Sequence, residues 1–107
     1  MASRTATPLE HPDLEEVSFS AALEALRDPH RLAMVAALAR KPGQPCGAIM
    51  PPVSKPAASR HFKILRAAGL LRQWDSGTQR LNALRHEEFD ARFPGLLDLA
   101  LTEAARG

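Results

Sequence analysis

The sequence predicts a mainly α fold with a small β-hairpin, and three observations support this class. At 107 residues the chain is long enough for one modest hydrophobic core but not for two. With no Tyr, one Trp and four Phe, that core must be built mainly from Leu, Ala, Val and Ile, a composition that favours helices. Apolar residues recur at helical spacing over most of the chain, and only residues 70–84 change to short alternating runs.

The N-terminal residues 1–12 are polar, contain Pro8 and Pro12, and show no apolar period. We therefore expect a flexible tail, followed by a single domain at 13–107 that opens with a helical turn at 13–16. Ser18 can cap a first helix, which is predicted by the helical spacing of Phe19, Ala22, Leu23 and Leu26.

A second helix is expected to begin at Asp28-Pro29 and to run to about Arg40. The Asp28 carboxylate can accept hydrogen bonds from the first N–H groups, and Pro29 suits the first helical position because its missing N–H is not needed there. The stretch Lys41-Pro42-Gly43 stops the helix. Its buried side is expected to carry Leu32, Val35, Ala36 and Ala39.

A short apolar segment and a longer basic helix follow. The segment from Cys46 to Met50 has room for one or two helical turns before Pro51-Pro52. The longer helix, residues 54–68, is predicted to begin with Ser54 as its cap and to end at Gly69. Its apolar face carries Ala58, Phe62 and Leu65, and its opposite arc carries Lys55, Ser59, Arg60, Lys63 and Arg66.

The last third of the chain predicts a hairpin and a final helical segment. Two short runs flank the polar loop 75–79, and a loop of that length containing glycine is typical of a β-hairpin at 70–84. Residues 87–105 are expected to form one helix interrupted at Pro94, or two helices joined there. The order of elements is that of a winged helix-turn-helix, with about five helices and a two-stranded wing.

Positive charge is concentrated in one part of this chain. Between Ser54 and Arg85 there are seven Lys and Arg residues and one acidic residue, Asp75, for a net charge of +6; the remaining seven basic and eleven acidic residues give −4. An exposed polar helix is often no more than a solvated face. Because this one is followed by a hairpin and nearly lacks acids, the charge pattern favours a protein that binds a phosphate backbone.

Three stretches of the sequence resemble one known family. They are Ala25-Leu26-Arg27-Asp28-Pro29-His30-Arg31-Leu32, the string from Val53-Ser54-Lys55-Pro56 to Gly69-Leu70-Leu71, and Gly77-Thr78-Gln79-Arg80. Over roughly residues 19–101 the chain resembles the arsenic-repressor-type (ArsR/SmtB) winged-helix regulators of bacteria and archaea. The resemblance implies a homodimeric DNA-binding transcriptional regulator, usually a repressor and often controlled by a metal ion.

The resemblance also implies where two copies meet, because the family dimerises through its first and last helices. The apolar residues of those helices are then either ordinary core or the dimer seam, and we expect the seam. The candidate interface residues are Phe19, Leu23, Leu97, Ala100, Leu101 and Ala104.

The sequence departs from the metal-sensing pattern of the family. Metal-responsive relatives carry Cys-x-Cys at the start of the third helix, where Gln44-Pro45-Cys46 supplies one cysteine. For the other common metal site of the family, on the last helix, the sequence offers only Asp98 and Glu103, and there is no histidine after His86. We therefore expect no cofactor and no metal site, although a site assembled in space from histidines stays an alternative.

On this interpretation the basic helix enters the major groove of double-stranded DNA, at a pseudo-palindromic operator. We expect base edges to be read by Lys55, Ser59 and Arg60, since an arginine can pair bidentately with guanine. Backbone phosphates, which position the protein without specifying sequence, are expected to contact Ser54, Lys63, Arg66, Thr78, Gln79 and Arg80.

Other classes of function fit the sequence less well. An enzyme is not expected, because the chain has no glycine-rich phosphate loop, no nucleophile elbow and no paired metal ligands. A regulator that needs a partner protein to bind DNA stays open. The sequence has neither an apolar run long enough for a membrane span nor a secretory signal, and its lone Cys46 fits a reducing compartment, so we expect a cytoplasmic protein.

Overall fold

The computed structural model describes residues 9–107, so most of the expected N-terminal tail lies outside the described residues. It contains five α-helices: α1 (Phe19–Arg27), α2 (Pro29–Arg40), α3 (Lys55–Ala67), α4 (His86–Arg92) and α5 (Leu96–Arg106). Two single turns of 3-10 helix, η1 (Leu14–Glu16) and η2 (Cys46–Ala48), precede α1 and α3. The three strands are β1 (Gln44–Pro45), β2 (Leu71–Ser76) and β3 (Gln79–Leu84).

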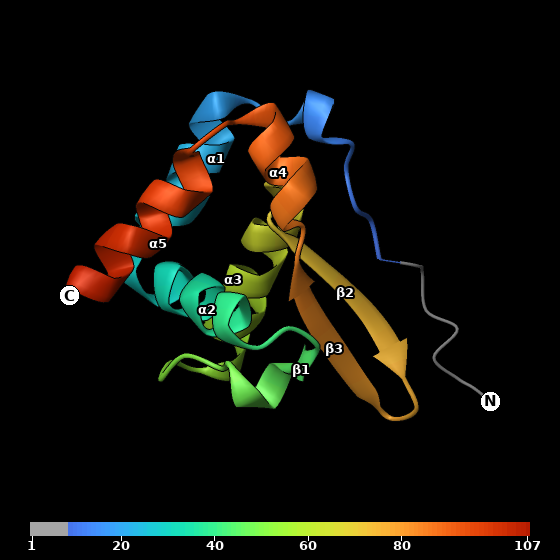
Figure 1. Ribbon diagram of the computed structural model, residues 1–107. Helices are drawn as coiled ribbons and strands as arrows, with labels where there is room; N and C mark the ends of the chain where they lie inside the picture. The colour runs from blue at the N-terminus through green and yellow to red at the C-terminus, as the bar shows by residue number, and fades with distance from the viewer. Residues whose placement is uncertain (1–8) are drawn as a thin grey trace.

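The helices form one body, and the strands stand beside it with the hairpin tip directed away (Figure 1). The central helix α2 contacts α1, α3 and α5, while α3 packs against β2. The predicted class, a winged helix-turn-helix with about five helices and a small antiparallel sheet, is confirmed. None of the helices in residues 9–107 combines the length and the apolar character that crossing a bilayer requires.

Side chains begin the first three helices at the residues that the sequence predicts. Ser18 Oγ accepts a hydrogen bond from the N–H of Ala21 at 3.1 Å, and Ser54 Oγ accepts one from Ala57 at 3.3 Å. The Asp28 carboxylate accepts two, from the N–H groups of the next helix at 2.8 and 3.1 Å. These caps satisfy backbone donors that have no partner within the helix, and so fix where each helix starts.

The buried side of α2 differs from the prediction. Val35 is buried as expected, but Ala39 is exposed and Leu32 and Ala36 are only half-buried. The inward positions are instead Arg31, Met34, Val35 and Leu38. The helix is rotated relative to the prediction because neighbouring elements pack on several of its sides. Its many short alanine side chains also make the direction of the apolar stripe hard to define from the sequence.

The sheet is larger, and its turn tighter, than predicted. Residues 44–45 pair with β3 as a third strand, giving the antiparallel order β1-β3-β2 where only a two-stranded wing was expected. Strand pairing continues to Ser76 and Gln79, so the predicted loop of five residues is a two-residue turn. Gly77 adopts φ +63° there, a conformation that a tight hairpin turn needs and glycine adopts without strain.

The C-terminal segment resolves into two helices, α4 and α5, as one of the two expected arrangements. Pro94 and Gly95 separate them, with Gly95 at φ +83°. Phe89 of α4 and Leu97 of α5 are fully buried and close the hydrophobic core against α1, α2 and η1. The core therefore lies among the helices and leaves one face of α3 uncovered beside the wing.

Candidate nucleic-acid interface

The basic helix α3 is held by its apolar face. Ala58, Phe62 and Leu65 are buried in the body of the protein, and this fixes the helix rotation. The opposite face is exposed to solvent and carries Lys55, Ser59, Arg60 and Lys63. The residues predicted to read bases are thus on one accessible surface, together with one predicted phosphate ligand.

Three cations on this face have no ion-pair partner among the described residues. Lys55, Arg60 and Lys63 form no ion pair with any acidic side chain of residues 9–107, whereas Arg27, Arg31 and Arg85 are among the basic side chains that do. Unpaired cations on one helix face keep their full positive potential for an external anion. Positive charge without an acidic partner is therefore concentrated on the face of α3 that the sequence predicts to be the recognition surface.

The wing adds residues beside α3. Thr78 and Gln79 lie exposed at the hairpin tip, as expected for residues that contact a ligand from the wing. Arg80 Nε donates to Asp75 Oδ1 at 3.1 Å across the strand pair. Such a partly exposed ion pair contributes little to stability. It orients the Arg80 side chain on the sheet face that turns toward α3.

A cleft of about 360 Å³ separates α3 from the wing. Four basic side chains and no acidic residue of 9–107 line it; the cations are Lys55, Lys63, Arg66 and Arg80. Ser59 and Cys46 also line this cleft. Residues far apart in the sequence thus form one concave cationic surface, and the helix and the hairpin present it together.

Arg66 differs from the other cations of α3. Its side chain is partly buried, and NH1 donates a hydrogen bond to Gln73 Oε1 on β2. Burial lowers the pKa of its guanidinium, and the nearby Arg80 lowers that pKa further. Arg66 therefore faces the wing more than the solvent.

Two other basic residues of the segment lie away from the cleft. Arg72 is on the opposite face of β2, with its guanidinium 5.5 Å from the centre of the Trp74 ring. Arg85 binds the Glu88 carboxylate at 2.9 and 3.0 Å and the Pro12 carbonyl at 2.8 Å. The net charge of the segment therefore overstates the charge of the surface.

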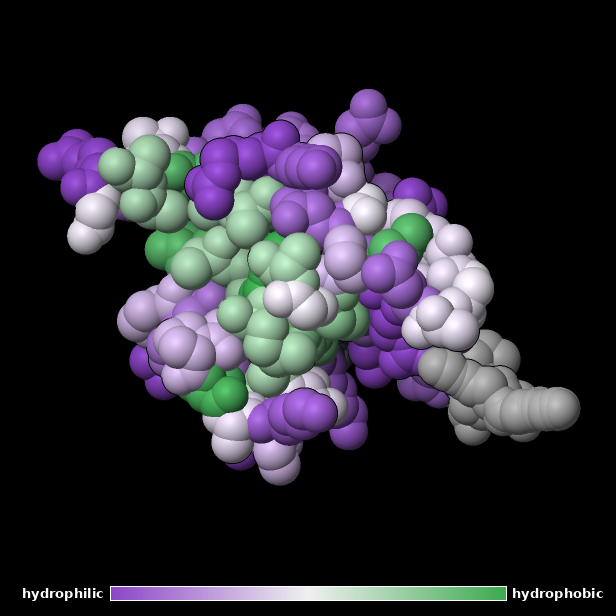
Figure 2. Space-filling model, turned by 90° about the horizontal axis from the view of Figure 1, so that it is seen from below, coloured by the Kyte–Doolittle hydropathy of each residue, from purple (hydrophilic) through white to green (hydrophobic). Residues whose placement is uncertain are grey.

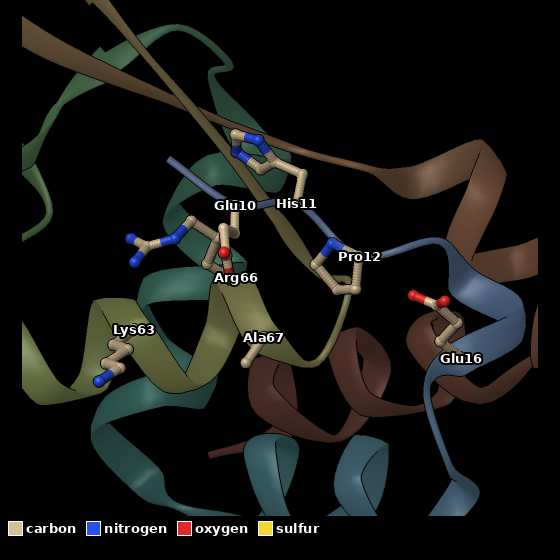
Figure 3. Close-up of a pocket in the computed structure, with 7 residues that line it drawn as sticks. All are labelled: Glu10, His11, Pro12, Glu16, Lys63, Arg66 and Ala67. Carbon is tan, nitrogen blue, oxygen red and sulfur yellow. The ribbon is translucent and has the colours of Figure 1, made fainter. Parts of the chain in front are cut away.

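A second hollow lies at the other end of α3, where residues 9–12 pass over the helix (Figure 3). It has a volume of about 480 Å³ and is lined by Glu10 and Glu16 as well as by Lys63 and Arg66. His11 Nε2 accepts a hydrogen bond from the N–H of Gln73 at 3.0 Å. Because carboxylates offset its cations, this hollow is a weaker site for an anion than the cleft beside the wing.

The residues expected at a dimer seam fall into three groups. Phe19 and Leu23 on α1 are exposed, at 56% and 42% of their surface. Ala100, Leu101 and Ala104 on α5 are half-buried. Leu97 is fully buried within the single chain, so it has no surface to offer a second copy.

The exposed Leu99, at 58%, was not among the expected seam residues. Apolar residues also cover much of the face seen from below, on the side of the molecule away from the hairpin tip (Figure 2). Helices α2 and α5 lie on that side, and α5 carries the half-buried seam candidates.

The described residues form no group of three or more His, Cys, Asp or Glu side chains that could hold a metal ion. The His30 and His61 rings lie with their centres 5.8 Å apart, and His86 Nε2 is 3.3 Å from Asp98 Oδ1. Each is a pair of potential ligands, fewer than the three that a protein metal site typically supplies.

Sequence reasoning missed three polar residues that hold the interface in place. Arg31, Gln73 and Asn82 are all at least 95% buried. For Gln73 and Asn82 a signal was present, because strand alternation puts them on the same inward faces as Leu71 and Leu84. A buried amide at such a position has to find hydrogen-bond partners, and both residues do.

The comparisons with known proteins agree with this geometry. Residues 26–73, from the end of α1 through α3 to β2, match the family model of a helix-turn-helix domain. The crystal structure of an ArsR family transcriptional regulator superposes with a TM-score of 0.62 at 26% identity, over 82% of this chain and 96% of that one. The chain has a winged-helix fold similar to that of ArsR family regulators. No curated protein matches it.

A second solved structure supports the same assignment to the ArsR-type fold. It is a "possible transcriptional regulator for arsenical resistance", with a TM-score of 0.58 and 25% identity over 78% of this chain and 95% of that one. The resemblance predicted from the sequence motifs is confirmed. The helix-turn-helix model and the matching solved proteins, which are described as transcriptional regulators, agree with the expectation that this chain is not an enzyme.

Proposed function

We propose that the chain is a homodimeric, sequence-specific DNA-binding regulator, acting as a repressor in the cytoplasm. The observation that carries the proposal is the exposed face of α3, where Lys55, Arg60 and Lys63 have no ion-pair partner among residues 9–107. In a helix-turn-helix protein the second helix of the motif enters the major groove, and α3 holds that position. Unpaired cations on it fit a polyanion.

The N-terminal half of α3 is the part that we propose reads base edges. Lys55, Ser59 and Arg60 are exposed there; Lys55 and Ser59 lie one helical turn apart on the same face, and Arg60 follows Ser59 directly. An arginine that pairs with guanine O6 and N7 discriminates against the wrong base by roughly 1–3 kcal/mol. Arg60 is the residue in this set whose planar guanidinium can form such a pair.

Phosphate contacts are proposed from the cap of α3, its second half and the wing. Ser54 Oγ already accepts from the N–H of Ala57, and its hydroxyl hydrogen can still be donated to a phosphate. Lys63 lies beside the cleft, and Arg80 lines it from the wing. Thr78 and Gln79 extend the contact to the hairpin tip, where the adjacent backbone or minor groove would lie.

The two proposed roles are separated by a pair of single substitutions on α3. Arg60→Ala is expected to weaken binding to the cognate site by roughly 1–3 kcal/mol and to relax specificity at one base pair. Lys63→Ala is expected to weaken cognate and random DNA by the same factor, because a phosphate contact carries no sequence information. Fluorescence anisotropy on both duplexes measures this, and equal effects of both variants on both duplexes would refute the assignment.

The dimer is proposed to form through α1 and α5, with Phe19, Leu23, Ala100, Leu101 and Ala104 in the seam and Leu99 added to it. Exposed large apolar side chains favour burial against a second copy. Leu99→Glu is expected to shift the protein from dimer to monomer in sedimentation-velocity runs. Met50→Glu is the matched control, since Met50 is likewise a large apolar side chain, 42% exposed, but lies outside α1 and α5. An unchanged dimer in Leu99→Glu rules out this seam.

A further inference from the structure

A continuous series of buried and part-buried hydrogen bonds crosses the wing and ends on α3. Asn82 Nδ2 donates to the Gln44 carbonyl at 2.9 Å, and Asn82 Oδ1 accepts from Gln73 Nε2 at 2.8 Å. Gln73 Oε1 in turn accepts from Arg66 NH1. These bonds therefore join β3, β2 and the last turns of α3 through side chains, and they reach β1 through the main-chain carbonyl of Gln44.

The same group of amides also reaches the end of α2. Gln44 Nε2 donates to the Ala37 and Lys41 carbonyls at 3.0 and 2.7 Å, at the end of α2. The N–H of Gly43 donates to the Asn82 carbonyl at 2.8 Å. Helices α2 and α3 are thus both connected to the wing through one set of polar groups.

Because these amides are buried, their hydrogen bonds restrict how the wing can be oriented relative to α3. Gln73 is 4% exposed and Asn82 is fully buried, and the described residues contain no buried side-chain polar atom without a partner. Each amide carries two donors and an acceptor in a fixed plane, so all its bonds can form only at one orientation of the strands relative to α3. An apolar pair in the same place would allow the wing to slide or tilt at small cost.

We propose that Arg66, Gln73 and Asn82 are positioning residues that fix the angle of the wing to α3. In this arrangement Arg66 supports DNA binding through Gln73, and it does not hold a phosphate itself. The inference rests on the proposed function and replaces the phosphate contact that the sequence predicts for Arg66. Arg80, Thr78 and Gln79 reach the DNA only if the hairpin stands at the angle that the buried amides set.

A double-mutant cycle on DNA affinity separates a positioning role from a phosphate contact. Arg66→Met and Gln73→Met are expected to weaken binding by a similar factor, about tenfold, and the double variant no more than either alone, because both break the same link. The uncharged Gln73→Met is also expected to reduce the salt dependence, since misplaced wing residues lose their phosphates. Lys63→Met is the matched control on α3, and its effect is expected to add to that of Gln73→Met.

Additive losses for Arg66→Met and Gln73→Met, with the salt dependence reduced by Arg66→Met alone, would overturn the proposal and return Arg66 to the phosphate contacts. If the wild-type dimer binds no DNA at all, the proposed function fails and not this inference alone.

A measurement on the protein without DNA covers the case in which Gln73→Met does not fold. In NMR spectra of Arg66→Met, the side-chain NH₂ resonances of Gln73 and Asn82 are expected to shift and to exchange faster with solvent. Unchanged resonances would show that the wing is held without Arg66, and the proposal would be wrong. The same spectra of Lys63→Met serve as the control and are expected to leave both NH₂ groups unchanged.

Discussion

Replacing the buried Arg31 by methionine is expected to destabilise the domain severely. Its Nε and NH2 donate to the Ala25 and Glu24 carbonyls, each at 2.9 Å. These carbonyls belong to the last turn of α1, whose C=O groups have no partner within the helix. NH1 lies 3.0 Å from His61 Nδ1 on α3, and because a guanidinium only donates, that nitrogen is the acceptor. One side chain thus ties α1, α2 and α3 together.

The expected loss of stability in Arg31→Met follows from the two carbonyl groups that lose their hydrogen-bond donor. A buried acceptor without a partner costs roughly 1–3 kcal/mol, and one of the two carbonyls is only partly buried, so we expect a loss of about 2–4 kcal/mol. For a domain of this size, each kcal/mol lowers the melting temperature by about 4–8 °C. Methionine keeps much of the side-chain volume, so the loss reports the hydrogen bonds and not a cavity.

Urea denaturation followed by circular dichroism measures the loss, with thermal melting as a second readout. Arg40→Met is the matched control, because Arg40 is an exposed arginine at the other end of α2 and its loss is expected to change stability by less than about 0.5 kcal/mol. If Arg31→Met is as stable as Arg40→Met, the guanidinium is not the cap of α1, and the reasoning about these carbonyls is wrong.

Two further predictions concern the contacts of residues 9–17. Burial lowers the pKa of His11 below its ordinary 6.5, and so do the nearby cations Arg85, Arg66 and Arg72. The folded state therefore favours neutral His11. The stabilisation that neutral His11 contributes is present above pH 6.5 and is lost as the pH falls through the lowered pKa. His11→Ala should remove this part of the pH dependence in urea titrations, and an unchanged profile would contradict it. Gly69→Ala should cost at least about 1–2 kcal/mol, because Gly69 adopts φ +76° and a Cβ there would lie 2.7 Å from Leu14 Cδ1. Gly47→Ala, with open space at its Cβ, is the control, and equal melting temperatures for the two alanine variants would refute the prediction.

Local signals in the sequence were sufficient for the helix starts and for the order of elements. Ser18, Asp28 and Ser54 cap their helices as predicted, because a cap depends only on a short side chain and the next three N–H groups. The apolar face of α3 was also predicted, since Ala58, Phe62 and Leu65 repeat at an unambiguous helical spacing. These features need no knowledge of distant residues.

Features that depend on distant neighbours could not be predicted. Arg31 was not among the residues expected on the buried side of its helix, and it is buried because the last carbonyls of α1 lie beside it and accept its hydrogen bonds. Leu97 was assigned to a seam between copies, but α5 packs it into the core of one chain. The third strand arises because the Gln44 backbone meets Asn82, a pairing of residues 38 positions apart. In each case the deciding partner comes from another element.

The central claim, that α3 and the wing together hold duplex DNA, is tested most directly by the salt dependence of operator binding. About 3–5 phosphate contacts per protomer in a dimer predict that log K falls with log salt concentration with a slope of roughly −5 to −9. Anisotropy titrations of the wild-type dimer with its own promoter region, at several salt concentrations, give the slope. Arg80→Met should reduce its magnitude by about 2, one phosphate for each wing. Salt-independent binding, or no binding by a well-folded dimer, would contradict the account.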